Sequence, residues 1–158
     1  MSRNIIKNIF IKNYKLYFII LLIFFDFVTK LFFSNYFIEK KVNIFGDYLF
    51  LELYKNTGIA FSIDLPYLKI ITIFVICLII WYYTKYEKKK NNKIIDLSFI
   101  LIISGAIGNA RERLVFGEVT DFIGIKYFSV FNLADIYINI GIIIYLIIII
   151  LKKDKHWL

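Results

Sequence analysis

The sequence predicts an all-α membrane protein with four transmembrane helices and a small extracytoplasmic β element between the first and second helices. Hydrophobic residues make up 60% of the 158 residues, and the mean hydropathy is +0.71, whereas a soluble domain is nearer to half apolar. Four apolar runs have about the 20 residues that a membrane-spanning helix needs. No repeat or linker divides the chain, so residues 1–158 form a single predicted integral-membrane domain.

The four predicted spans cover about 14–33, 66–83, 94–109 and 132–151. The first has a basic start but no small-residue cleavage site, and Asp26 interrupts it, so we interpret it as a retained helix rather than a signal peptide. Pro66 suits the first turn of the second helix, with Asp64 as a candidate N-cap. The third ends in small residues (SGAIGNA) that permit close helix packing, and the fourth is almost entirely Ile and Leu.

The β element is predicted from residues 48–63. Tyr48–Tyr54 is rich in residues that favour strands, and Lys55–Gly58 supplies turn residues. Ile59–Ile63 is then a candidate return strand. We expect this element to lie on one membrane face.

The distribution of basic residues predicts the orientation. The formal net charge is +8, and the Lys and Arg clusters lie at the N-terminus, between residues 84 and 93, and in the tail. The positive-inside rule therefore places both termini in the cytoplasm and the β element outside. Short basic clusters between apolar runs fit anionic lipid head groups better than nucleic acid.

The available chemistry is that of carboxylates. His156 is the single histidine and lies in the tail, which removes a Ser-His-Asp triad and any multi-histidine metal site. No GxSxG, HExxH or P-loop motif is present, and no cofactor is expected. Asp121 and Asp135 are expected at the outer ends of the third and fourth helices. Two adjacent carboxylates can share a proton, so that one activates water as a base while the other acts as an acid.

Each acidic candidate also has a structural interpretation. Asn132 and Asp135 have the spacing of a capping box, and Asp121 is alternatively an exposed loop acid. Asp26 and Lys30 share a helix face and either neutralise each other or orient substrate or loop. Glu112 lies between two arginines, which predicts an interfacial ion pair. A function of a different class is also open: a small proton-coupled transporter would use the acidic residues to relay protons.

Four motifs in order resemble those of the bacterial lipoprotein signal peptidases, also called signal peptidase II. Asp26-Phe-Val-Thr-Lys30 resembles D-x-x-[ST]-K, and Asn56-Thr-Gly-Ile-Ala-Phe61 resembles N-x-G-x-A-[FW]. Residues 108–122 resemble G-N-x-x-D-R-x-x-x-G-x-V-x-D-F, and residues 131–135 resemble F-N-x-A-D. The length and the four-helix plan agree as well, so the resemblance covers nearly the whole chain.

The resemblance implies a metal-independent aspartic endopeptidase of the bacterial cytoplasmic (inner) membrane. Its substrates would be prolipoproteins, cut just before a cysteine that carries diacylglycerol, and globomycin-type antibiotics would inhibit it. Asp121 and Asp135 would be catalytic, at the extracytoplasmic face. The residues that would shape the site around them are Asp26, Lys30, Asn56, Gly58, Ala60, Asn109, Glu112, Arg113, Asn132 and Ala134.

Glu112 is the main departure from the family pattern, which has Asp before this arginine. Glutamate keeps the charge but is one methylene longer, so it affects the supporting geometry more than the chemistry. It leaves open a second reading of the resemblance, that of a catalytically impaired relative that binds lipoprotein precursors.

Overall fold

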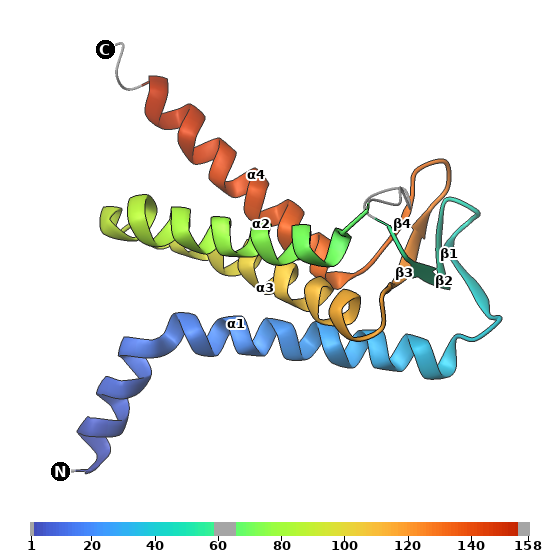
Figure 1. Cartoon of the computed structure of the whole chain (residues 1–158), viewed down its shortest axis with the longest axis horizontal. Coiled ribbons are helices and arrows are strands. Elements are labelled where there is room, and N and C mark those ends of the chain that lie inside the picture. Colours follow the sequence, from blue (N-terminus) through green and yellow to red (C-terminus); the bar gives the residue numbers. More distant parts are fainter. Residues whose placement is uncertain (1, 59–65, 155–158) are drawn as a thin grey trace.

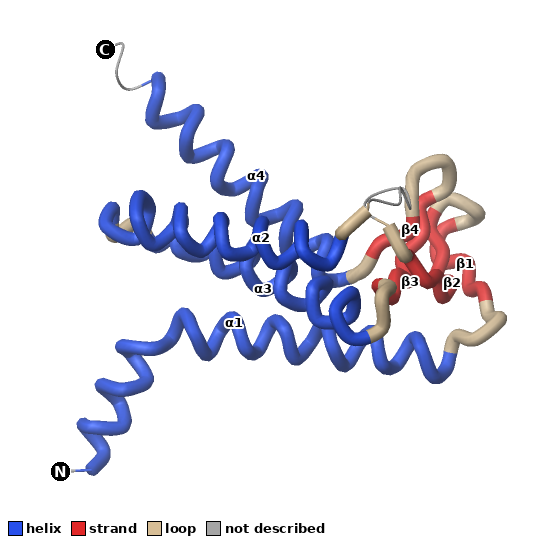
Figure 2. Tube along the Cα trace, viewed as in Figure 1, coloured by secondary structure: helices blue, strands red, loops and turns tan. Residues whose placement is uncertain are grey.

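Four long helices dominate the computed structural model, which describes residues 2–58 and 66–154 (Figures 1 and 2). They are α1 (Ser2–Tyr36), α2 (Leu68–Tyr82), α3 (Lys93–Val115) and α4 (Leu133–Asp154), and α2 continues through the short helices η2 (Tyr83–Glu87) and η3 (Lys88–Lys90). The parts long and apolar enough to cross a membrane are Asn13–Tyr36, Leu68–Lys90, Lys93–Val115 and Leu133–Lys152. The prediction of four long apolar helices is therefore confirmed.

The β element is a four-stranded antiparallel sheet, larger than predicted. Its strands lie in the order β1 (Lys41–Phe45), β2 (Leu49–Asn56), β3 (Val119–Ile125) and β4 (Val130–Phe131). The first two come from between α1 and α2, as expected, and the other two come from the segment between α3 and α4, for which no strand was predicted. The predicted return strand, Ile59–Ile63, falls outside the described residues.

The sheet lies at one end of the helical bundle, while the first turns of α1 and the last turns of α4 lie toward the opposite end (Figure 1). Helix α3 is the most buried of the four helices, whereas α2 buries none of its residues. A Cβ atom on Gly105 would clash with the Ala134 carbonyl oxygen, and one on Gly141 would lie 2.6 Å from the Ser98 carbonyl oxygen. The predicted close packing of small residues is thus the contact between α3 and α4.

Several helix boundaries differ from the sequence prediction. Helix α1 begins at Ser2, well before the predicted start at residue 14. Helix α3 runs to Val115 instead of ending near residue 109, because the charged residue Glu112 turns inward to a buried partner. Helix α2 begins at Leu68, after a turn in which Tyr67 adopts a left-handed conformation (φ 60°). Pro66 therefore precedes the helix, and its candidate cap Asp64 lies outside the described residues.

Polar contacts at the end opposite the sheet tie α2 to the bundle. The Tyr82 and Tyr145 hydroxyls lie 2.8 Å apart, which joins α2 to α4. The Tyr83 hydroxyl donates to Asp96 (2.6 Å), and Asp96 forms a salt bridge with Lys15 (2.6 Å). These tyrosines pack against Ile95, Phe99 and Ile103, which form the buried apolar core of α3.

Candidate active site

Asp121 lies on strand β3, where β3 pairs with β2 and Asp121 is the register partner of Tyr54. This corrects the prediction that Asp121 ends the third helix, because that helix stops at Val115 and the chain then turns into the sheet. The residue is 2% exposed. Asn56 donates its side-chain amide to Oδ2 of Asp121 (3.0 Å), and Asn132 donates to Oδ1 (2.6 Å).

Asp135 lies in the first turn of α4. Its Oδ2 accepts the backbone N–H of Asn132 (3.0 Å), and Asn132 Oδ1 accepts the backbone N–H of Asp135 (3.1 Å). This reciprocal pair confirms the capping box that the spacing predicted. The other oxygen, Oδ1, accepts the side-chain amide of Asn109 (2.7 Å). Because capping uses only Oδ2, the other oxygen of Asp135 faces helix α3. Asp135 can therefore cap α4 and also take part in a site with Asp121.

Two buried amides connect the carboxylates. Asn132 Nδ2, which contacts Asp121, also donates to Asn109 Oδ1 (3.1 Å), and Asn109 contacts Asp135. Lys30 Nζ donates to the same Asn109 oxygen (2.8 Å). Because a lysine only donates, this contact fixes which end of the Asn109 amide faces Asp135. The result is a continuous path of hydrogen bonds from one aspartate to the other.

Lys30 and Asp26 form the expected i,i+4 pair, with 2.9 Å between Nζ and Oδ2 and 2% exposure of each side chain. The pair does more than neutralise itself. Asp26 Oδ1 accepts the backbone N–H of Ala134 (3.0 Å), which attaches α1 to the beginning of α4. A Cβ on Gly108 would lie 2.6 Å from Asp26 Oδ2, so α3 must carry a glycine here for α1 to approach.

Glu112 supports the site by contacting Thr120 and Lys30 rather than the arginines on either side of it in the sequence. Its carboxylate accepts the backbone N–H (2.8 Å) and the hydroxyl (3.0 Å) of Thr120 and lies 3.6 Å from Lys30 Nζ. The predicted ion pair with a flanking arginine is therefore wrong, since Lys30 is the salt-bridge partner of Glu112. Thr120 was not predicted, although its position directly before Asp121 could have singled it out once the strand was known.

Arg113 and Gly58 hold the turn after β2. Arg113 Nη2 donates to the Gly58 carbonyl oxygen (3.0 Å), and the Gly58 N–H donates to Asn56 Oδ1 (3.0 Å). Asn56 is thereby oriented with its N–H group toward Asp121. Of the predicted site residues, the structure brings together all except Ala60, which lies outside the described residues.

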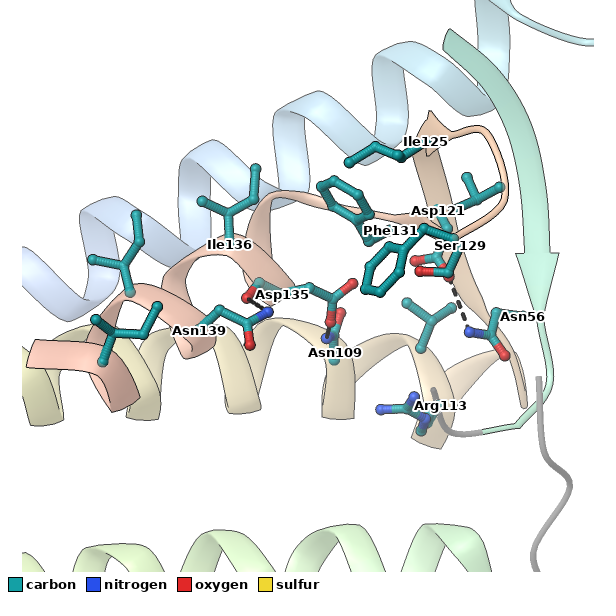
Figure 3. A pocket seen from close by; sticks show the side chains of 15 residues that line it. Asn56, Asn109, Arg113, Asp121, Ile125, Ser129, Phe131, Asp135, Ile136 and Asn139 are labelled. Carbon is teal, nitrogen blue, oxygen red and sulfur yellow. Dashed lines mark hydrogen bonds between the residues drawn. The ribbon is translucent and has the colours of Figure 1, made fainter. Parts of the chain in front are cut away.

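Both aspartates line one pocket of about 490 Å³. Figure 3 shows Asp121 and Asn56 on the strand side and Asp135, Asn109 and Asn139 on the helical side. An apolar wall completes the pocket, and sequence reasoning missed it because its members come from the β3–β4 hairpin and one face of α4. This wall includes Ile125, Phe128, Val130, Phe131, Ile136, Ile140 and Ile143.

Burial raises the pKa of Asp121 to about 6, well above its ordinary value of 3.8. The hydrogen bonds from Asn56 and Asn132 oppose this shift, whereas the nearby negative charge of Asp135 adds to it. A carboxyl group with such a pKa exchanges a proton near neutral pH. A protonated acid and an adjacent carboxylate in one pocket are the groups that an aspartic hydrolase requires.

Fold and site together define a class: a membrane protein with four spans and a paired-carboxylate pocket at one end of its bundle. A profile of the signal peptidase (SPase) II family matches residues 18–151. The chain therefore belongs to the signal peptidase II family of aspartic membrane peptidases.

Several relatives carry the name lipoprotein signal peptidase. The protein of Caldicellulosiruptor bescii is 39% identical over 134 residues, covering 81% of this chain and 84% of its own. That of Borrelia duttonii is 33% identical over 167 aligned residues, covering 96% of this chain and 97% of its own. A solved bacterial membrane enzyme superposes with a TM-score of 0.75 at 28% identity and covers 90% of both chains.

Proposed function

We propose that this chain removes signal peptides from prolipoproteins and that Asp121 and Asp135 are its catalytic pair. The observation that supports this most directly is their arrangement. Both carboxylates line one pocket and are joined through the buried amides of Asn109 and Asn132. The family assignment and the names of the relatives agree with this activity.

In the proposed reaction, Asp121 carries the proton before water attacks, because it is the more buried carboxyl of the two and its pKa is raised. Asp135 accepts a proton from the water, whose oxygen bonds to the carbonyl carbon of the scissile peptide. Asp121 donates its proton to the developing oxyanion. The C–N bond then breaks as the leaving amine takes the proton from Asp135. A hydroxyl of the tetrahedral intermediate gives its proton back to Asp121 as the product carboxyl group forms, so the pair returns to its starting state.

The remaining predicted residues position this pair. Lys30, held by Asp26 and Glu112, fixes the Asn109 amide, and Arg113 holds the turn that orients Asn56. Electrostatic preorganisation of this kind stabilises charge that develops during the reaction.

The apolar wall of the pocket favours a lipid-modified substrate. Ile136, Ile140 and Ile143 lie on α4, where the pocket meets the exposed apolar surface of a candidate membrane-spanning helix. We therefore propose cleavage just before a cysteine that carries diacylglycerol, with its acyl chains along this wall. Globomycin-type inhibitors would occupy the same pocket.

The proposed orientation has both chain ends in the cytoplasm and the sheet at the extracytoplasmic face. The basic cluster of residues 85–93 lies at the end of the bundle away from the sheet, as the positive-inside rule requires for that orientation. The scissile bond would then lie at the outer membrane surface, where water reaches the carboxylates.

Two alternatives receive less support. A proton relay needs acids through the depth of the membrane, but α3 has no acid between Asp96 and Glu112, and Asp96 is paired with Lys15. An impaired relative would follow from a poorly placed Glu112, yet its carboxylate contacts both Thr120 and Lys30.

The test is cleavage of a diacylglyceryl-modified precursor by purified wild type, Asp121→Asn and Asp135→Asn. Each substitution keeps the side-chain shape, and we expect product formation to fall by orders of magnitude. Asp47→Asn is the matched control, because Asp47 is an exposed acid (73%) at the same end of the molecule. Normal turnover by either active-site variant at normal protein levels would rule out the proposed pair.

A further inference from the structure

A second pocket, of about 250 Å³, lies between α1 and the sheet-proximal end of α3. It shares no lining residue with the active-site pocket. Its apolar side is formed by Phe27, Leu31 and Phe116, and its polar side includes Ser34, Lys55 and Arg111. The proposed reaction assigns no task to any of these six residues.

Arg111 is the cation that most needs an explanation. It is exposed, and none of the salt bridges between described residues includes it. Its guanidinium lies over the Phe27 ring, 4.3 Å from the centroid. Stacking of this kind leaves the edge of the guanidinium free to form bidentate hydrogen bonds with an anion.

The exposed rim of the pocket, rather than its buried wall, favours an anion. In the wall, Lys30 pairs with both Asp26 and Glu112, and the surplus negative charge of these carboxylates is stabilised by the backbone N–H groups of Ala134 and Thr120. The rim holds two cations, Lys55 and Arg111, and one carboxylate, Glu118, which lies 3.7 Å from Lys55 Nζ. The rim therefore carries a net positive charge.

The surroundings indicate an anion that belongs to the membrane. Leu31 is 47% exposed and Phe116 is 62% exposed, and Leu31 lies within a predicted membrane-spanning segment. A free anion would bind the cations and leave these apolar side chains uncovered, whereas an acyl chain would cover them.

We propose that this pocket binds the head group of an anionic phospholipid from the leaflet on the sheet side. The phosphodiester would bind Arg111 and Lys55, and an acyl chain would pack along Phe27, Leu31 and the exposed face of α1. A zwitterionic head group fits less well, because its ammonium would add a cation beside two others. This site is distinct from the one for the lipid-modified substrate, and it does not depend on the catalytic roles proposed above.

Binding at this pocket would also reinforce the active site. Lys30 and Glu112 form its inner wall, and the same two residues hold Asn109 and Thr120. A bound lipid would join α1, α3 and β2 at their junction, so we expect it to raise the melting temperature of the protein.

Native mass spectrometry of the full chain, purified in detergent and titrated with phosphatidylglycerol or phosphatidylcholine, tests the proposal. We expect one phosphatidylglycerol to bind preferentially, and Arg111→Gln to weaken that binding about tenfold through loss of a charge-assisted contact. Lys55→Gln should weaken it as well. Lys126→Gln is the matched control, since it removes a cation from the β3–β4 hairpin without touching this pocket.

Equal binding of the two lipids, or unchanged binding in Arg111→Gln, would overturn the proposal. So would a loss in Lys126→Gln as large as that in Arg111→Gln, since binding would then follow net charge alone. Displacement of the lipid by millimolar inorganic phosphate would identify a free-anion site instead. The assay involves no cleavage, so its outcome is independent of the proposed peptidase activity.

Discussion

Asn132 and Asp135 bond reciprocally, each side chain to the other's backbone N–H, at 3.0 and 3.1 Å. The side-chain oxygen of Asn132 thus caps the N-terminus of helix α4, while its amide nitrogen donates to both Asp121 and Asn109. One residue therefore couples the start of a transmembrane helix to the geometry of the carboxylate pair.

This coupling predicts that Asn132→Ala loses both stability and activity. Loss of the helix cap should lower the free energy of unfolding by about 1 kcal/mol, and loss of the contact with Asp121 should lower turnover at least about tenfold. Asn92→Ala is the matched control, because Asn92 caps α3 at the far end of the bundle through Ile94 and Ile95. It should lose similar stability with unchanged turnover per folded molecule. Equal turnover in the two variants would contradict the role of Asn132.

The pH dependence of cleavage should report the proton on Asp121. Its pKa is raised to about 6, so turnover should fall as the pH rises through this region and the proton is lost. The Asn56 amide stabilises the charged form of Asp121, so in Asn56→Leu the carboxyl group should keep its proton to higher pH. The alkaline limb of the pH–activity profile, where turnover falls, should therefore move to higher pH. Asn43→Leu removes the amide from an exposed Asn–Asp pair in the same sheet and should leave the limb in place. A limb that moves downward in Asn56→Leu would refute the assignment.

Two substitutions of Glu112 should distinguish the contribution of its negative charge from that of its side-chain length. Glu112→Asp should stay active, because it keeps the charge beside Lys30 and has the family's side chain. Glu112→Ala should lose about 1–3 kcal/mol of stability and most activity, because the buried Thr120 N–H loses its acceptor. Glu52→Ala removes an exposed acid of the same sheet and should behave like wild type. Wild-type cleavage by Glu112→Ala would disprove the supporting role.

Cysteine labelling can test the orientation. Cys77 lies exposed on α2, so it is first replaced by serine, and single cysteines are then placed at Asn43 in β1 and at Asn91 in the turn before α3. A membrane-impermeant reagent added to intact cells should label position 43 and spare position 91. The opposite pattern would invert the proposed topology.

The contacts that the sequence predicted correctly are local. Asp26 and Lys30 are one helical turn apart, and Asn132 and Asp135 have capping-box spacing, so both pairs follow from backbone periodicity. The contacts that it missed join distant segments, such as Lys30 with Asn109, 79 residues away, and Glu112 with Lys30. Strand β3 was missed because Asp121 and Gly124 interrupt its pattern, and it is defined instead by pairing with β2.

The division of the site among α1, β2, α3, β3 and α4 has a consequence for biosynthesis. A ribosome makes the chain from its N-terminus, so Asp121 emerges before Asn132 and Asp135, which belong to the start of the last helix. Until that helix enters the membrane, Asp121 has Asn56 beside it but lacks both the amide of Asn132 and its companion carboxylate. If the two aspartates are the catalytic pair proposed above, a chain truncated before α4 lacks half of that pair, and proteolytic competence arises only with the final insertion event.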